Sequence, residues 1–287
     1  MKQKILKIIK DVAIIIFLIF FIAKPLIIDA YKVKDINMSN EIIKGDFVFV
    51  NKFIHGAKSI QYIPFTNVPL PYFSLPAFTE PDRGDLVVFK YPGDRDKLKP
   101  EKEEYLILRV IGLPGDIIEI IDKLVFVNGK KMVIPDGLKY MNNESYKKNI
   151  IDKNIFPKGM NWNKDNYGPL VVPSEGTVFE VNATNIEQWQ IIINREYDKN
   201  VVSVLNKEVF IDGNKTNTYK VKNDYYFLMG DNRDDCKDSR FFGFVKREEI
   251  IGQPFLIFWS WDTDIPFSDI FDLIGSIRLG RIIKFID

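Results

Sequence analysis

The feature that most constrains this chain is a Gly-Asp pair that recurs at 45–46, 84–85 and 115–116. Glycine adopts the left-handed backbone of a turn without steric cost, and an aspartate side chain can close such a turn onto the main chain. Each pair directly precedes a short run of β-branched or aromatic residues bounded by turn signals. These runs, with one more of the same kind, lie at 47–50, 86–89, 117–121 and 124–127. The pattern predicts a mainly β fold.

Composition narrows the chemistry that such a fold can carry. The 287 residues include 40 Lys and Arg against 39 Asp and Glu, which leaves a net charge of +1 and argues against a nucleic-acid-binding surface. The hydrophobic content of 46% supplies a sizeable core. A single cysteine, Cys236, excludes an intramolecular disulfide, and a single histidine, His55, disfavours a Ser-His-Asp triad or a histidine-rich zinc site. We therefore expect neither a metal nor a cofactor.

The N-terminus has a basic start followed by an apolar segment. Residues 12–23 contain no polar side chain, and the apolar stretch continues past Lys24 to position 28. Residues 12–28 reach the lower limit of the roughly 17–25 residues that a spanning helix needs. The preceding lysines favour a cytoplasmic N-terminus; they are Lys2, Lys4, Lys7 and Lys10. We expect residues 1–30 to be a cytoplasmic tip and one transmembrane helix in the cytoplasmic (inner) membrane, with the rest extracytoplasmic. A signal peptide cleaved after Ala30 is the alternative.

The remainder divides by composition. Residues 130–222 are rich in Asn and Lys, and we interpret 131–222 as an inserted, smaller β subdomain. It interrupts a larger β domain formed by 31–130 and 223–287. Within the insert, strand-like runs lie at 178–181, 190–193 and 201–205. The aromatic run at 255–261 fits either a core strand or a surface that contacts the membrane.

Four blocks, in this order, resemble the bacterial type I signal peptidases, membrane-anchored enzymes that cut signal peptides from exported proteins. The first block, INMSNEIIKGD at 36–46, is similar to the family's S-M-x-P-T-L-x-x-G-D. The second, RGDLVVF at 83–89, is close to R-G-D-[IL]-V-V-F. The third is RVIGLPGD at 109–116, and the fourth is GDNR at 230–233 followed by DSR at 238–240. The resemblance implies the family's β catalytic domain with a smaller β domain inserted in it.

The resemblance also implies a Ser-Lys dyad. In that chemistry a serine hydroxyl attacks the scissile carbonyl, and an unprotonated lysine takes the proton of the hydroxyl. The lysine must be buried, because desolvation is what lowers the pKa of an amine enough to make it a base.

The residues at the chemical positions depart from this pattern. Counting along the blocks without gaps places Asn37 at the nucleophile position and Leu108 at the base position. An amide has no hydroxyl to activate, and a leucine side chain has no lone pair. Asp35 stands where many members carry a helper hydroxyl, and an ionised carboxylate would repel an oxyanion. Cys236 replaces a serine that hydrogen-bonds the lysine in many members. The chain is thus predicted to lack the dyad.

Other residues of the blocks match the family. Met38 directly follows the nucleophile position. In this family, the charged residues at the matching positions hold the loops behind the catalytic lysine. We interpret the corresponding residues here as a structural ion-pair network. They are Arg109, Asp231, Arg233, Asp238 and Arg240.

Ser39, the hydroxyl residue of the first block, is the alternative nucleophile. In an extended chain it would lie about 6–7 Å from position 37, so the whole site would have to move. Three lysines considered as bases are interpreted as solvated surface charges; they are Lys34, Lys44 and Lys90. The thiol of Cys236 lies among aspartates and is interpreted as inert.

These observations leave three functions. A non-catalytic member would sit in contact with membrane lipid. There it would bind the signal peptides of exported preproteins or an active signal peptidase. An active signal peptidase I, a serine endopeptidase, would need a rearranged site that uses Ser39. A purely structural membrane protein would bind no peptide. We favour the first.

Overall fold

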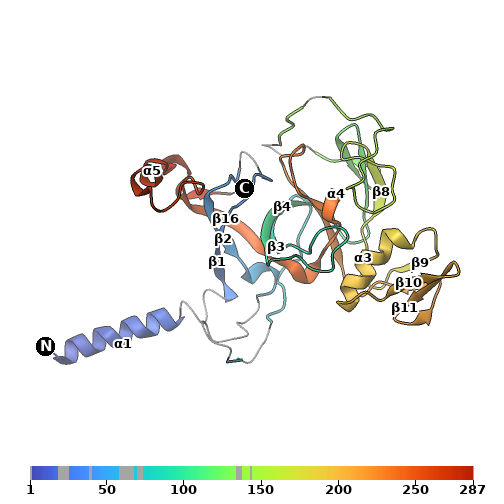
Figure 1. The fold of residues 1–287 in the computed structure, drawn as a ribbon. Helices are drawn as coiled ribbons and strands as arrows, with labels where there is room; N and C mark the ends of the chain where they lie inside the picture. The colour runs from blue at the N-terminus through green and yellow to red at the C-terminus, as the bar shows by residue number, and fades with distance from the viewer. Residues whose placement is uncertain are drawn as a thin grey trace. The chain divides into compact units, whose positions relative to one another are not determined.

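The computed structural model describes residues 2–18, 26–38, 41–57, 68–69, 74–133, 138–142 and 144–286 (Figure 1). The chain divides into two compact units, which are described separately. Unit 1 comprises Met1–Lys34, Lys44–Pro81 and Ile251–Asp287, and unit 2 comprises Asp35–Ile43 and Asp82–Ile250. Antiparallel strands dominate both, and the predicted mainly β fold is confirmed.

Unit 1 is built on an antiparallel sheet in which β2 pairs with both β1 and β16, and β17 adds to β16. Its elements are α1 (Lys2–Leu18), β1 (Ile28–Lys32), β2 (Asp46–Asn51), the 3₁₀ helix η2 (Phe53–His55), β16 (Ile250–Ser260), α5 (Ile270–Gly275), the 3₁₀ helix η4 (Leu279–Arg281) and β17 (Lys284–Phe285).

Strand β2 shows the alternation expected of a half-covered sheet. Val48 and Val50 are completely buried, whereas Phe47 and Phe49 are half-buried on the opposite face. There Phe49 stacks on Phe258 of β16 with ring centroids 4.2 Å apart. The aromatic run at 255–261 therefore lies mainly in a strand whose aromatic side chains remain partly accessible.

The Gly45-Asp46 pair shows why such a turn needs both residues. Gly45 has a φ of 93°, and a Cβ at this position would lie 2.0 Å from the carbonyl oxygen of Trp261. The completely buried Asp46 carboxylate binds Arg281, with Nη2 2.6 Å from Oδ2. The turn thereby holds the C-terminal segment against β2.

The predicted membrane span lies partly outside the described residues. Helix α1 covers its first part, and residues 19–25 are not described. Among the helices of the described ranges, none combines the length and the apolar character needed to cross a bilayer.

Unit 2 contains four antiparallel arrangements: β3-β4-β14-β15, β7-β6-β5-β8, β10-β11-β12 and β9-β13. Its elements are β3 (Leu86–Lys90), β4 (Tyr105–Gly112), β5 (Ile117–Ile121), β6 (Leu124–Val127), β7 (Lys130–Lys131), β8 (Tyr167–Val171), β9 (Val178–Glu180), α3 (Ile186–Tyr197), β10 (Val202–Leu205), β11 (Glu208–Ile211), β12 (Asn214–Lys215), β13 (Thr218–Lys220), β14 (Tyr225–Met229), α4 (Ser239–Phe242), β15 (Val245–Lys246) and the 3₁₀ helix η3 (Arg247–Glu249).

The three strands predicted directly after the Gly-Asp pairs are present as β2, β3 and β5, and the further run at 124–127 is β6. The strand predicted at 190–193 is wrong, because these residues belong to helix α3. Ile186, Trp189 and Ile193 have the i, i+3, i+7 spacing of a helical stripe, and this stripe packs on the core formed with β11 and β13. The predicted smaller subdomain at 131–222 thus carries a helix. Its boundaries stay a prediction, since 82–250 form one unit.

Candidate functional site

Asn37, at the predicted nucleophile position, is buried, and its side-chain oxygen, its carbonyl and its N–H each make a hydrogen bond. Its Oδ1 accepts a hydrogen bond from the backbone N–H of Lys237 at 3.1 Å. Its carbonyl accepts from the Asn232 N–H at 3.0 Å, and its own N–H donates to Oδ1 of Asp35 at 3.0 Å. The first and fourth blocks therefore meet at this side chain, although they lie about 200 positions apart.

Cys236 lies beside Asn37. A Cβ placed on Gly230 would lie 2.1 Å from the Cys236 Sγ and 2.5 Å from the Asn37 carbonyl oxygen, so position 230 accepts only glycine without rearrangement. Burial, and then the nearby Asp238 carboxylate, raises the pKa of the Cys236 thiol well above its usual value. A thiol held neutral in this way is a poor nucleophile.

Asp35 is the charged group next to this position. Its Oδ1 accepts the Asn37 N–H, and burial followed by the charge of Glu104 raises the pKa of its carboxyl. When it is ionised, Asp35 places negative charge close to the backbone of Asn37.

Leu108, at the predicted base position, lies in the middle of β4. It pairs with Val87 of β3 and is completely buried, as are its neighbours Val110 and Ile111. This environment would desolvate an amine, as the dyad chemistry requires, but a leucine offers nothing to protonate.

Arg109 follows Leu108 on β4, and the alternation of the strand turns its side chain to the other face. Its Nη2 lies 2.7 Å from Oδ2 of Asp231 and its Nε 3.1 Å from Oδ1, in a two-point ion pair. Its Nη1 donates to the Gly84 carbonyl at 2.8 Å, and Nη2 lies 3.5 Å from a Glu41 oxygen. The pair joins the second, third and fourth blocks.

Asp238 and Arg240 form a second buried pair. Nη2 of Arg240 lies 2.7 Å from Oδ2 of Asp238, whose Oδ1 also caps α4 by accepting the Arg240 N–H at 3.0 Å.

Arg233 differs from the predicted ion-pair network. Its Nη1 contacts Met229 Sδ at 2.8 Å, and among the described residues it has no carboxylate partner. Burial, and then the charge of Arg240, lowers the pKa of Arg233.

The remaining predicted residues fall into two groups. Met38 is buried, whereas Ser39, the alternative nucleophile, lies outside the described residues. The three lysines are not placed as bases: Lys44 pairs with Asp264 at 2.6 Å, Lys90 pairs with Glu103 at 2.6 Å, and Lys34 is exposed.

Lys237 is the site residue that the sequence did not reveal. It meets Asn37 through its backbone, and a main-chain donor leaves no mark in residue type. Its ammonium lies 3.2 Å from Oδ1 of Asp94 and 4.0 Å from the ring centroid of Tyr91. These contacts hold the loop between β14 and α4 in place from the outside.

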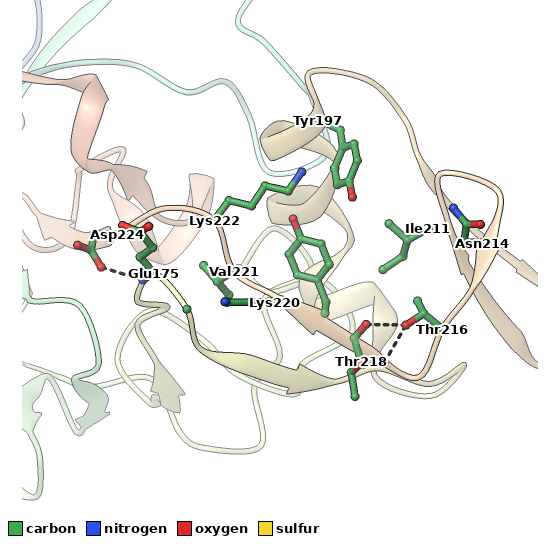
Figure 2. Close-up of a pocket in the computed structure, with 12 residues that line it drawn as sticks. Glu175, Tyr197, Ile211, Asn214, Thr216, Thr218, Lys220, Val221, Lys222 and Asp224 are labelled. Atoms are coloured by element: carbon green, nitrogen blue, oxygen red, sulfur yellow. Dashed lines mark hydrogen bonds between the residues drawn. The ribbon is translucent and has the colours of Figure 1, made fainter.

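The cavities of unit 2 include one beside the site and one away from it. One of about 610 Å³ includes Arg109, Gly84 and Met132 in its lining and adjoins the site. Another, of about 900 Å³, contains none of the predicted site residues in its lining; Figure 2 shows Lys222 reaching over Tyr197 in it. Over the described ranges, no cluster of three or more His, Cys, Asp or Glu residues could hold a metal ion.

Comparison with known proteins decides the family. The model of the family "Signal peptidase, peptidase S26" matches residues 5–259. The chain belongs to this family. The signal peptidase I of Rickettsia typhi is 29% identical over 285 residues, covering 93% of this chain and 88% of the relative. The signal peptidase I of Buchnera aphidicola is 28% identical over 284 residues, covering 91% and 80%.

The crystal structure of a signal peptidase I from Enterococcus faecalis is also similar to this peptidase S26 family member. It is 20% identical, with a TM-score of 0.30, and the match covers 62% of this chain and 98% of that one. The mainly β fold of the present chain rests on its own sheets rather than on this similarity.

Proposed function

We propose that this signal peptidase family member binds signal peptides of exported preproteins and does not cleave them. The observation that carries the proposal is which side chains occupy the nucleophile and base positions. Asn37 offers an amide already hydrogen-bonded through Oδ1, and Leu108 offers a buried hydrocarbon. Neither group can supply a nucleophile or accept its proton.

The expected deficit is large. Removing members of a catalytic serine-protease unit costs roughly 10⁴ to 10⁶ in rate, because each member depends on the others. The scaffold around the missing groups is nonetheless retained. Buried pairs at Arg109 and Asp231, and at Arg240 and Asp238, fix the strands and loops that carry the two positions. A retained scaffold without its reactive groups suits binding better than turnover.

The experiment uses the purified full chain in detergent and a preprotein whose signal ends in A-x-A. We expect saturable binding, no cleavage, and no labelling by a serine-directed acylating inhibitor. The Ser39→Ala variant should bind as the parent does. Robust cleavage that Ser39→Ala abolishes would instead establish an active signal peptidase with a rearranged site. Absence of binding would leave only a structural role.

We further propose that residues 1–30 anchor the protein in the cytoplasmic membrane, with the two β units outside. The support is the basic start followed by the apolar segment. Protease added outside spheroplasts should then degrade the chain beyond residue 31. A protected C-terminal portion would contradict this topology, and a mature chain that starts at Tyr31 would indicate a cleaved signal peptide. An active signal peptidase is proposed as a further partner, testable by co-purification with the preprotein present and absent.

A further inference from the structure

We infer that Asn37 has become a recognition residue, whose Nδ2 donates a hydrogen bond to a backbone carbonyl of the bound peptide. This inference rests on the proposed peptide-binding function. It assigns to Asn37 a hydrogen bond in the place where a serine hydroxyl would attack the peptide. In the dyad chemistry the nucleophile position faces the scissile carbonyl, so that carbonyl is the acceptor we assign to Nδ2.

The orientation of the Asn37 amide follows from its partner. The oxygen and nitrogen of an asparagine side chain are normally hard to distinguish, and the hydrogen-bond network must decide between them. Here the partner is the backbone N–H of Lys237, which can only donate, at 3.1 Å. The atom facing Lys237 is therefore Oδ1, and Nδ2 points away from it.

The Nδ2 group is free to bind a ligand. Within the described part of the chain Asn37 makes three hydrogen bonds, through its N–H, its carbonyl and Oδ1, and none of them uses Nδ2. Nor does Nδ2 belong to the fully buried polar atoms that lack a partner. Nδ2 therefore keeps some access, although the residue as a whole is only 4% exposed. A donor in such a place needs an acceptor from solvent or from a ligand.

The donor is also held rigidly. Asn37 is fixed on both sides of its backbone, by Asp35 and by the Asn232 N–H. Asn232 in turn donates through Nδ2 to the carbonyl of Ile36 at 3.3 Å. A group held in this way loses little conformational entropy when a ligand binds.

The surroundings of Asn37 select a neutral acceptor. The Asp35 carboxylate lies 3.0 Å from the Asn37 N–H, and a ligand carboxylate placed nearby would meet like charge. A peptide carbonyl carries no charge and avoids this repulsion. The site should therefore prefer an uncut signal peptide to one that ends in a new carboxylate at the A-x-A position.

The test measures binding of labelled synthetic signal peptides to the full chain in detergent by fluorescence anisotropy. Asn37→Asp keeps an acceptor for the Lys237 N–H, removes the donor and keeps the size of the side chain. We expect the dissociation constant to rise at least about fivefold. Asn200→Asp is the matched control: it adds the same charge at an exposed residue whose Oδ1 already accepts a hydrogen bond, and it should leave binding unchanged.

A second measurement identifies the carbonyl. Single thioamide replacements along the peptide weaken one acceptor at a time, and we expect one position to matter for the parent and not for Asn37→Asp. If Asn37→Asp does not fold, the scan on the parent alone still decides, because uniform affinity at all positions would overturn the inference. Failure of the parent to bind any peptide would instead refute the proposed function. Equal binding by the parent and Asn37→Asp would refute only the role of Nδ2.

A third arm compares peptides that end at the last alanine of A-x-A as a carboxylate or as a carboxamide. The carboxamide should bind more tightly to the parent, and Asp35→Asn should reduce the difference, since it removes the opposing charge. A carboxylate peptide that binds as tightly as the carboxamide would overturn the selection for an uncut chain.

Discussion

The Arg109 guanidinium and the Asp231 carboxylate face each other through two hydrogen bonds inside unit 2, with Nη2 2.7 Å from Oδ2 and Nε 3.1 Å from Oδ1. The two side chains are only 9% and 2% exposed. The pair fastens β4, which also carries Leu108, to the loop that begins after β14.

The first prediction concerns the stability of this pair. Asp231→Asn removes the two-point carboxylate partner of the buried Arg109 charge and leaves it the more distant Glu41 at 3.5 Å. Breaking a buried pair in this way costs about 3–5 kcal/mol of unfolding free energy. Urea unfolding measures the loss. Glu103→Gln is the matched control, because its pair with Lys90 is about half exposed and should contribute less than about 1 kcal/mol. Equal losses for the two variants would show that burial does not govern this site.

The second prediction is restoration of cleavage. Asn37→Ser combined with Leu108→Lys should yield measurable cutting of an A-x-A preprotein, since complete burial at position 108 favours a neutral, basic lysine. The same burial should lower stability. Adding Asp35→Ser should increase the rate by removing a charge that opposes the oxyanion.

The controls for restoration are the single variants and Asn37→Ala with Leu108→Lys, all of which should be silent in cleavage and in labelling by a serine-directed inhibitor. A hydroxyl without a base is weakly nucleophilic, and a base without a hydroxyl has nothing to activate. Cutting by the alanine double variant would place the nucleophile elsewhere.

The third prediction links Asp35 to pH. Burial raises the pKa of this carboxyl above its unfolded value of about 3.9, so the folded chain holds the proton more tightly. The stabilising contribution is full below the unfolded pKa and is lost as pH rises through the folded pKa. Asp35→Asn should therefore gain stability over the parent at pH 7, with the gain shrinking as pH falls through the folded pKa and disappearing below the unfolded value of about 3.9.

The measurement is the difference in unfolding free energy between Asp35→Asn and the parent across this pH range, in which other titrating groups largely cancel. The control Asp235→Asn changes an exposed aspartate of the neighbouring loop and should give a smaller gain at pH 7, because solvent screens an exposed charge. A gain for Asp35→Asn that is largest at acid pH would contradict a pKa raised by burial.

The fourth prediction is that the Cys236 thiol reacts slowly in the native protein. Its pKa is raised by burial, so little thiolate forms at pH 8. Because the chain has one cysteine, labelling by a thiol reagent reports this residue alone. We expect a native rate on the order of tenfold or more below that in guanidinium chloride. A native rate equal to the unfolded one would mean that the thiol is accessible and ionises normally.

The sequence predicted much of the frame of this molecule. Turn residues act through their own backbone, so the Gly-Asp pairs placed β2, β3 and β5 correctly. Motif spacing likewise identified the family, which the match over residues 5–259 shows. At 190–193 the local pattern of apolar residues wrongly predicted a strand. An apolar run of this length fits either a strand or a helix, and only the burial of Ile186 and Ile193 against one core favours α3.

The tertiary structure decided how the site residues are connected. Residue types alone identified Asn37 and Leu108 as unreactive, because reactivity belongs to the functional group. That Asn37 is oriented by the Lys237 backbone is a contact between segments 200 positions apart, and no residue type signals it. Arg233, predicted in an ion-pair network, instead lies against Met229. Pairing among buried charges depends on which side chains packing brings within about 4 Å, and only the folded chain fixes that geometry.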